Sequence, residues 1–347
     1  KTVFVFPGQG SQWDGMARDL LTTSPVFTHH LTQAADAINQ FTDWNLIDIL
    51  TGQPHTPPPD RVDILQPALF AINTALARLW QHHNIHPDAV IGHSQGEIAA
   101  AHIAGALTLH DAAKIITLRS QTIHTHLAGT GAMASVPLPT DQTTTHLTHY
   151  DDLHIAAHNS PTTTVIAGNP HQVKALVDEL NARNIRARLI PVDYASHTPH
   201  IHPLRNTLHT LLDDITPQPA DIAFYSTLHA QHLHDTTQLD ATYWYDNLAN
   251  PVQLHPTLNH LTHDHHTTYI EISPHPVLTH ALTDTLPPHT LITETLRRNQ
   301  GTLTRFHHNL AHLHTHGHPT HWHHPQPTTP PHHLPTYPYQ QRRYWLD

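Results

Sequence analysis

The sequence predicts an α/β protein with two parts: a large subdomain built on a parallel β-sheet, and a small βαββαβ subdomain inserted into it. The first observation is that two short apolar stretches, residues 2–6 and 89–91, each run into a glycine-containing turn. This is typical of buried strands in a parallel sheet. The second observation is that residues 132–192 alternate between strand-like and helix-like patterns in the order of a split βαβ unit.

The elements of the large subdomain begin with the strand at residues 2–6, which ends at PGQG. Residues 25–50 have helical periodicity, and residues 67–80 are predicted as a helix with Pro at its start. A second strand at 89–91 is followed by the turn GHSQG and by an alanine-rich helix at 97–107. Strand, tight turn and helix are the context of a nucleophile elbow, so we expect this subdomain to resemble the α/β-hydrolase fold.

The small subdomain follows a further helix predicted at residues 111–127. Its predicted strands are residues 132–138, 153–158, 163–167 and 186–192, and its predicted helices are residues 140–150 and 170–184. This order is that of a ferredoxin-like unit. The chain then returns to the large subdomain, with a strand at 269–272 and a helix at 276–285.

These patterns divide the chain into three regions. We expect residues 1–128 and 195–296 to form the large α/β-hydrolase-like catalytic subdomain, and residues 129–194 the ferredoxin-like one. Residues 297–347 are expected to hold a C-terminal helix and a proline-rich linker. The first strand begins almost at once, so we expect the chain to be a piece of a larger protein.

Composition excludes several classes of function. The chain of 347 residues has 16 Lys and Arg against 27 Asp and Glu, a net charge of −11, and no basic run. It therefore lacks the electrostatic signature of a nucleic-acid-binding protein. With no Cys, disulfides, thiolate metal sites and a cysteine nucleophile are excluded. No apolar run is long enough to span a membrane, and there is no signal peptide, so we expect a cytoplasmic location.

Ser94 is the candidate nucleophile, because it stands at the centre of GHSQG between a strand and a helix. A serine hydroxyl needs a base and an exposed, strained turn before it reacts. The backbone N–H of Gln95, at the start of the helix, is placed where an oxyanion would form. A glycine-rich β–α turn with a chance serine is the alternative, which the motif alone leaves open.

Six motifs that follow one another along the chain favour the nucleophile over a chance serine. They are FPGQGSQ (6–12), GHSQGE (92–97), Arg119, YASH (194–197), NPVQ (250–253) and SPHPVL (273–278). Together they resemble the malonyl-CoA:acyl-carrier-protein acyltransferase family, and more narrowly the acyltransferase domain of a modular type I polyketide synthase. The resemblance runs from about residue 3 to residue 346, and the closing YPYQQRRYWL is similar to the linker that follows such domains.

The resemblance implies a role for each matching residue. Ser94 would carry the acyl group, His197 would act as general base and then acid, and the N–H of His197 would be held by a backbone carbonyl near Gln253. The Gln95 N–H and Gln9 would form the oxyanion hole. Arg119 would grip the carboxylate of the donor, which a planar guanidinium does through two parallel hydrogen bonds.

The acyl group is predicted to be methylmalonyl. RVDILQP (61–67, including Gln66) resembles a signature of methylmalonyl-selective domains, and Gln95 differs from the apolar residue of malonyl-selective relatives. YASH replaces their HAFH, so Ser196 stands where a phenylalanine would fill the space of an α-methyl group. Tyr194 and His93 are further candidates for substrate binding. Malonyl-CoA remains the alternative donor, since one methyl group is worth only about 1–3 kcal/mol.

The resemblance also implies partners: an acyl carrier protein whose phosphopantetheine accepts the acyl group, with the ketosynthase and other domains of the synthase as neighbours. Acyl-CoA is a substrate, and we expect no bound cofactor. An esterase or thioesterase of the α/β-hydrolase type is the alternative of a different class. It would have an HGG-type oxyanion loop, which the sequence lacks. A metal site in the histidine-rich stretch 307–324 is a third possibility, but that stretch has no HExxH motif and no carboxylate, so we expect no metal.

Overall fold

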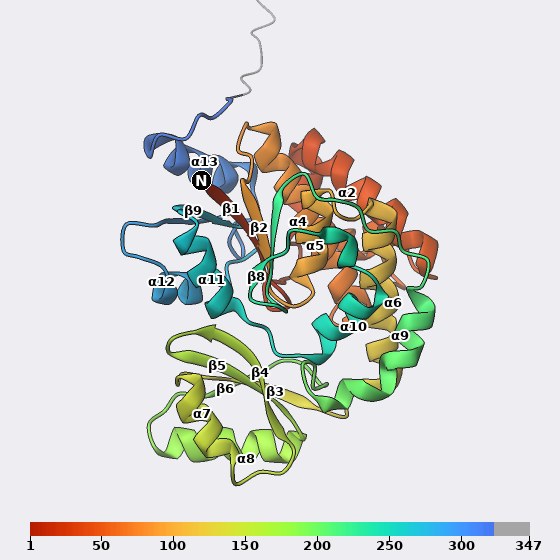
Figure 1. Cartoon of the computed structure of the whole chain (residues 1–347). Helices are drawn as coiled ribbons and strands as arrows, with labels where there is room; N and C mark the ends of the chain where they lie inside the picture. The colour runs from red at the N-terminus through yellow and green to blue at the C-terminus, as the bar shows by residue number, and fades with distance from the viewer. Residues whose placement is uncertain (323–347) are drawn as a thin grey trace, which may run out of the picture.

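The computed structural model describes residues 1–322, and it contains two β-sheets in two spatially distinct subdomains (Figure 1). The large sheet has the strand order β10-β9-β1-β2-β7-β8, and all its pairings are parallel except that of β7 with β8. The strands of the large sheet are β1 (Thr2–Phe6), β2 (Ala89–Gly92), β7 (Ala223–Ser226), β8 (Gln231–His232), β9 (Thr268–Glu271) and β10 (Leu291–Glu294).

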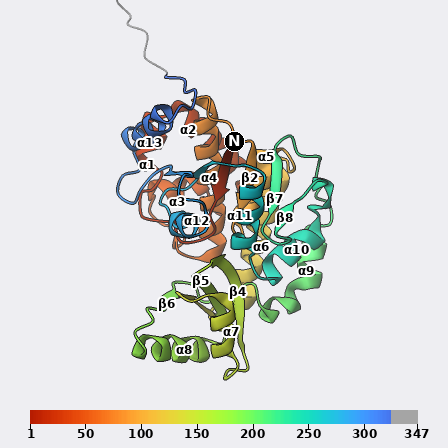
Figure 2. The same cartoon turned by 60° about the vertical axis from the view of Figure 1, so that its left-hand side comes forward.

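The small sheet is antiparallel, with the order β4-β5-β3-β6. Its strands are β3 (Ala132–Val136), β4 (Leu153–Ser160), β5 (Thr163–Gly168) and β6 (Arg188–Ile190), and its helices are α7 (Thr140–Leu147) and α8 (Pro170–Ala182). This strand order is that of a ferredoxin-like unit. A view turned by 60° also shows the small subdomain at one end of the molecule (Figure 2). The predicted fold class is therefore confirmed.

Helices surround the large sheet. On the N-terminal side of the chain these are α1 (Arg18–Thr23), α2 (Pro25–Ile38), η1 (Asn39–Phe41), α3 (Leu46–Thr51), α4 (Val62–His82), α5 (Gly96–Ala104) and α6 (Leu109–Leu127). After the small subdomain come η2 (Pro199–Leu204), α9 (Arg205–Leu211), η3 (Thr236–Gln238), α10 (Ala241–Ala249), α11 (Leu254–His263), α12 (Thr279–Thr285) and α13 (Leu303–Thr315).

Strand β1 shows how the sheet is sandwiched between two hydrophobic cores. Its side chains alternate between the two faces of the sheet. Phe4 and Phe6 pack into the core built by α2, α4, α5 and α6, while Val3 and Val5 pack with α11, α12 and strands of the small subdomain. Because the strand is buried on both faces, its sequence is a continuous apolar run rather than an alternating one.

A backbone bridge joins the two subdomains. The amide of Val252 donates to the carbonyl of Ala156 at 2.9 Å, and the amide of His158 donates to the carbonyl of Val252 at 2.8 Å. The segment between α10 and α11 is therefore hydrogen-bonded to strand β4. We propose that the subdomain boundaries lie at residues 129 and 194, as the sequence suggests. Of the predicted C-terminal region, residues 323–347 lie outside the described residues.

Two predicted helix starts are wrong. Helix α4 begins at Val62, so Pro67 lies inside it. The proline ring removes one backbone donor, but burial of most of this helix stabilises it. The helix predicted at residue 276 begins only at Thr279, because the amides of Val277 and Leu278 donate to the buried carboxylate of Glu271, at 2.6 and 3.0 Å. Those hydrogen bonds hold the segment as a loop.

Candidate active site

The turn between β2 and α5 has the strained geometry of a nucleophile elbow. Ser94 has a φ of 54°, a left-handed conformation that is uncommon for a residue other than glycine. A methyl group on Gly92 would lie 2.1 Å from the amide nitrogen of Glu97, and one on Gly96 would lie 2.1 Å from the carbonyl oxygen of Phe6. Both glycines are therefore required for the strand and the helix to meet this closely.

Ser94 and His197 are hydrogen-bonded to each other. The Ser94 Oγ lies 2.8 Å from His197 Nε2, and His197 Nδ1 lies 2.9 Å from the carbonyl oxygen of Asn250. A carbonyl only accepts, so Nδ1 carries the ring proton and Nε2 is left to accept from the serine hydroxyl. The acceptor is the Asn250 carbonyl and not Gln253, whose amide instead donates to the Thr227 carbonyl at 2.7 Å.

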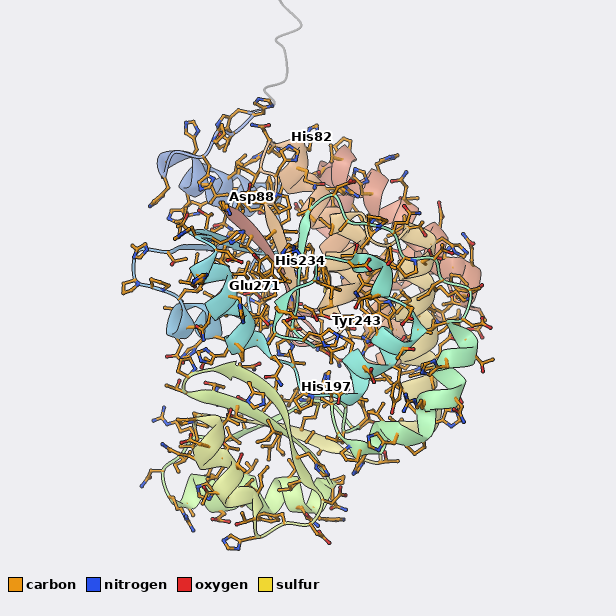
Figure 3. All side chains as sticks on the ribbon, viewed as in Figure 1. His82, Asp88, His197, His234, Tyr243 and Glu271 are labelled. Carbon is orange, nitrogen blue, oxygen red and sulfur yellow. The ribbon has the colours of Figure 1, made fainter. Side chains whose placement is uncertain are left out.

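His197 sits at the junction of the two subdomains (Figure 3) and is buried, being 4% exposed. Burial, together with the neighbouring His93 and Arg119, lowers the pKa of His197 to about 3. Burial disfavours the charged imidazolium, and nearby positive groups disfavour it further. The ring is therefore neutral at physiological pH, which is the form that accepts a proton from serine.

This pKa predicts the pH dependence of Ser94 acylation. With a pKa of about 3, His197 stays deprotonated at pH 5, so the single-turnover rate should change by less than about threefold between pH 8 and pH 5. A histidine with the ordinary pKa near 6.5 would lose roughly 30-fold over that range. Quenched reactions read by intact mass measure the rate, with circular dichroism at each pH as the control for folding. A steep fall between pH 7 and pH 6 would contradict the assignment.

The PGQG loop lies directly against the elbow. The amide of His93 donates to the carbonyl of Phe6 at 2.8 Å. The Tyr194 hydroxyl donates to Gln9 Oε1 at 3.0 Å and accepts from Gln66 Nε2 at 3.1 Å. Gln95 immediately precedes the first residue of α5, where backbone amides have no partner within the helix. This arrangement places both predicted oxyanion donors beside Ser94, but their role stays a prediction.

Arg119, on helix α6, is almost completely buried, with 1% of its surface exposed. Its Nη1 donates to Asn247 Oδ1 at 2.8 Å, and within residues 1–322 its Nε has no hydrogen-bond partner. In the same part of the chain it makes no ion pair with a carboxylate. Burial lowers the pKa of Arg119 to about 10, so the guanidinium stays charged at neutral pH. An unpaired buried guanidinium is suited to binding an anionic group.

These residues share one cavity of about 280 Å³ between the two subdomains. The predicted site residues that line it are Gln9, Gln66, His93, Ser94, Gln95, Arg119, Tyr194, Ser196 and His197. Apolar side chains from the small subdomain, among them Met133, Val165 and Ile190, complete the wall. His93 Nε2 lies 2.8 Å from Asn159 Oδ1, and burial lowers the pKa of His93. Gln253 does not line the cavity.

Sequence reasoning missed three residues at the site. Asn250 contributes the carbonyl that contacts His197, Asn247 contacts Arg119, and Glu97 contacts Asn247. Glu97 and Asn250 stand within the motifs GHSQGE and NPVQ, so a signal was present for those two. No side-chain pattern identifies Asn247, because its contacts are to residues more than 120 positions away.

The described residues contain neither a cluster of metal-ligating side chains nor a membrane-spanning helix. Within residues 1–322, no three His, Asp or Glu side chains gather closely enough to hold a metal ion. In the same range, no helix combines the length and apolar character needed to cross a bilayer.

Comparison with known proteins identifies the family. The profile described as "Acyl transferase domain" matches residues 3–319. The chain is 44% identical over 348 residues to the pikromycin polyketide synthase component PikAIII of Streptomyces venezuelae, across 100% of this chain and 22% of that protein. The acyltransferase domain from module 8 of the salinomycin polyketide synthase is similar with a TM-score of 0.89 and 43% identity, over 92% of this chain and 76% of that one. A loading acyltransferase from the avermectin modular polyketide synthase is similar with a TM-score of 0.88 and 43% identity, over 90% of this chain and 100% of that one.

The fold, the serine elbow and these matches define the chain as an acyltransferase. It belongs to the acyl transferase domain family, and within that family it is an acyltransferase domain of the kind found in modular type I polyketide synthases. The chain spans 22% of the pikromycin component and 6% of a polyketide synthase of Streptomyces halstedii.

Proposed function

We propose that the chain transfers a methylmalonyl extender unit from CoA to Ser94, and then to the phosphopantetheine thiol of an acyl carrier protein. The observation that carries this proposal is one cavity that holds a hydrogen-bonded serine–histidine pair and a charged arginine, whose Nε has no hydrogen-bond partner within residues 1–322. The pair supplies an activated nucleophile, and the arginine supplies a binding group for a donor that ends in a carboxylate.

In the first half-reaction, Ser94 Oγ attacks the thioester carbonyl while His197 Nε2 takes the hydroxyl proton. The tetrahedral oxyanion would accept hydrogen bonds from the backbone of Gln95 and from Gln9. The carbon–sulfur bond then breaks, and His197 returns the proton to the CoA sulfur. In the second half-reaction, His197 takes the proton of the phosphopantetheine thiol, the thiolate attacks the acyl ester, and the proton goes back to Ser94 Oγ.

The selectivity for methylmalonyl is proposed to arise at Ser196. This side chain lines the cavity next to His197, and its hydroxyl contacts Met133 Sδ at 3.5 Å. A small side chain here leaves space for an α-methyl group, whereas a phenyl ring would fill that space. Met133, which the Ser196 hydroxyl contacts, is an apolar part of the same wall.

We expect Ser196→Phe to shift the preference from methylmalonyl-CoA toward malonyl-CoA by about 10- to 100-fold in the ratio of kcat/KM, since one methyl group is worth about 1–3 kcal/mol. Competition between the two donors, read by the mass of the acyl-enzyme, measures this ratio. Ser135→Phe, on strand β3 outside the cavity, is the matched control. An unchanged donor ratio in a folded Ser196→Phe protein would place the selectivity elsewhere.

Intact-mass analysis tests the function as a whole. The full chain is incubated with methylmalonyl-CoA and, in parallel, with malonyl-CoA. The adduct is mapped to its peptide, and its lifetime is followed in buffer and with a phosphopantetheinylated acyl carrier protein. We expect an adduct on Ser94 that persists in buffer and is discharged by the carrier protein, with none in Ser94→Ala. Loss to water faster than to the carrier protein would support a hydrolase, and a malonyl preference would support the alternative donor.

The same proposal assigns the partners. The carrier protein would reach Ser94 through the cleft between the subdomains, and the ketosynthase and other domains of a synthase would be neighbours. Acyl-CoA enters this scheme as a substrate, and the chemistry of Ser94, His197 and Arg119 needs no metal or other cofactor.

A further inference from the structure

A buried polar network behind the cavity ends on Arg119. We propose that Asn247 and Glu97 are positioning residues that aim the guanidinium of Arg119 at the donor carboxylate, and thereby make the site selective for carboxylated donors. This inference rests on the proposed function, because it concerns how the same donor is recognised. The residues come from α5, α6 and α10, three helices of the large subdomain.

Glu97 anchors the network. It has no exposed surface, and its Oε1 accepts hydrogen bonds from the backbone amide and from the hydroxyl of Thr227, the latter at 2.7 Å. Its Oε2 accepts from the hydroxyl of Tyr243 at 2.7 Å and from Asn247 Nδ2 at 2.9 Å. The Thr227 hydroxyl has one proton and also lies 2.7 Å from the Gly92 carbonyl oxygen, so it is shared between two acceptors. The other three donors, the Thr227 amide, the Tyr243 hydroxyl and Asn247 Nδ2, hold Glu97 in position. Figure 3 shows Tyr243 on the large-subdomain side of His197.

The Asn247 side chain has three hydrogen-bond partners: Arg119, Glu97 and, at 3.5 Å from Nδ2, the backbone carbonyl of Ser94. The orientation of the amide follows from Arg119 and Glu97. The guanidinium of Arg119 only donates, so Oδ1 of Asn247 must face Nη1, and Nδ2 is then turned toward Glu97 Oε2. Among residues of this size, only asparagine presents a donor and an acceptor in the required directions. Aspartate would bring a second carboxylate against Glu97, and leucine would leave both partners unsatisfied.

The network holds Arg119 without neutralising it. Because Nη1 is engaged by Asn247, the edge formed by Nε and Nη2 remains for a ligand, and Nε has no partner within residues 1–322. A carboxylate in direct contact with Arg119 would occupy that edge and compete with the donor. The neutral amide separates Glu97 from Arg119 and avoids that competition, which is why the residue between them is Asn247.

Helix α10 also links this network to the catalytic pair. The residue after Asn247, Leu248, accepts a hydrogen bond from the backbone amide of His197 at 2.8 Å, and Asn250 accepts from its ring. The C-terminal end of α10 therefore fixes the histidine and the arginine relative to each other. A test must separate an effect on Arg119 from an effect on His197.

The test compares donors with and without a carboxylate. In Asn247→Leu and Asn247→Asp, kcat/KM for loading by methylmalonyl-CoA is expected to fall about 10- to 100-fold more than kcat/KM for loading by propionyl-CoA, the range for a lost charged hydrogen bond. Glu97→Gln keeps an oxygen that can accept from Asn247, so the selective fall in kcat/KM for methylmalonyl-CoA should be smaller in this variant. Asn309→Leu is the matched control. Asn309 is also buried and its Nδ2 also donates a hydrogen bond, but the acceptor is the Thr295 carbonyl and Asn309 does not line the cavity.

A double-mutant cycle shows whether Asn247 acts through Arg119. In an Arg119→Ala background, Asn247→Leu should cause no further selective loss of methylmalonyl-CoA loading. Equal losses for both donors, or a selective loss that persists without Arg119, would overturn the inference. If Asn247→Leu does not fold, as judged by circular dichroism, Asn247→Asp gives the same comparison, and Glu97→Gln gives the smaller selective loss expected when an oxygen acceptor remains. If wild type itself does not prefer the carboxylated donor, it is the proposed function that fails.

Discussion

Replacing His197 with alanine should lower the single-turnover rate of Ser94 acylation by about 10³- to 10⁴-fold at pH 7, the range for loss of a well-placed general base together with its activation of the nucleophile. Within the described residues, His197 is the only side chain hydrogen-bonded to Ser94 Oγ, and its Nε2 lies 2.8 Å from that oxygen. Without it, the serine hydroxyl loses the group that accepts its proton during attack. The rate is measured by quenching and intact mass at saturating methylmalonyl-CoA.

His200→Ala is a suitable control for that measurement. His200 stands three residues further along, and its ring contacts Asp152 at 2.7 Å rather than lining the cavity. We expect it to retain acylation within about threefold of wild type, as for a substitution outside the catalytic machinery. A His197→Ala protein that folds and still loads Ser94 at the wild-type rate would show that another group acts as the base.

Arg119→Ala should separate donors by their charge. Two charge-assisted hydrogen bonds to a carboxylate are lost, so kcat/KM for methylmalonyl-CoA should fall by about 100- to 1,000-fold. Loading by propionyl-CoA, which differs only by the missing carboxylate, should fall much less or increase. Arg119→Lys should give an intermediate value, because an ammonium group keeps the charge but cannot form the parallel pair of hydrogen bonds.

The comparison of the two donors is made with one enzyme preparation and the acyl-CoA esters in parallel. Thermal unfolding of the variant is the control, since Arg119 is buried and its loss can also destabilise the protein. Equal losses for methylmalonyl-CoA and propionyl-CoA would show that Arg119 supports the structure of the site rather than recognition of the carboxylate.

Much of the fold could be predicted because its signals are local. The apolar run of β1, the glycine-bounded elbow and the alternating patterns of the small subdomain each depend on neighbouring residues. One failure occurred where a side chain outside the helix decides where the helix starts. The amides of Val277 and Leu278 are taken up by Glu271, so α12 starts three residues later than its pattern suggests.

The residues of the site also fall into those that the sequence could identify and those that it could not. Ser94, His197 and Arg119 could be selected because they stand in recognisable motifs, and the structure brings all three to one cavity. Asn247 could not be selected, because its contacts with Glu97 and Arg119 arise only when α5, α6 and α10 pack together. The acceptor for His197 was expected near Gln253 and is three residues earlier, since a backbone carbonyl leaves no mark in the amino-acid sequence.

The backbone carbonyl of Asn250, which accepts from His197, has a consequence for how the site tolerates mutation. A side-chain acceptor is deleted by a single substitution, whereas every residue type at position 250 supplies a carbonyl. The bridge that holds this segment, between Val252 and strand β4, is likewise formed by main-chain atoms alone. Alanine scanning of residues 250–252 should therefore underestimate their importance. The orientation of the catalytic imidazole is encoded in the path of the chain, and it is robust to changes that would disable a triad built on a carboxylate.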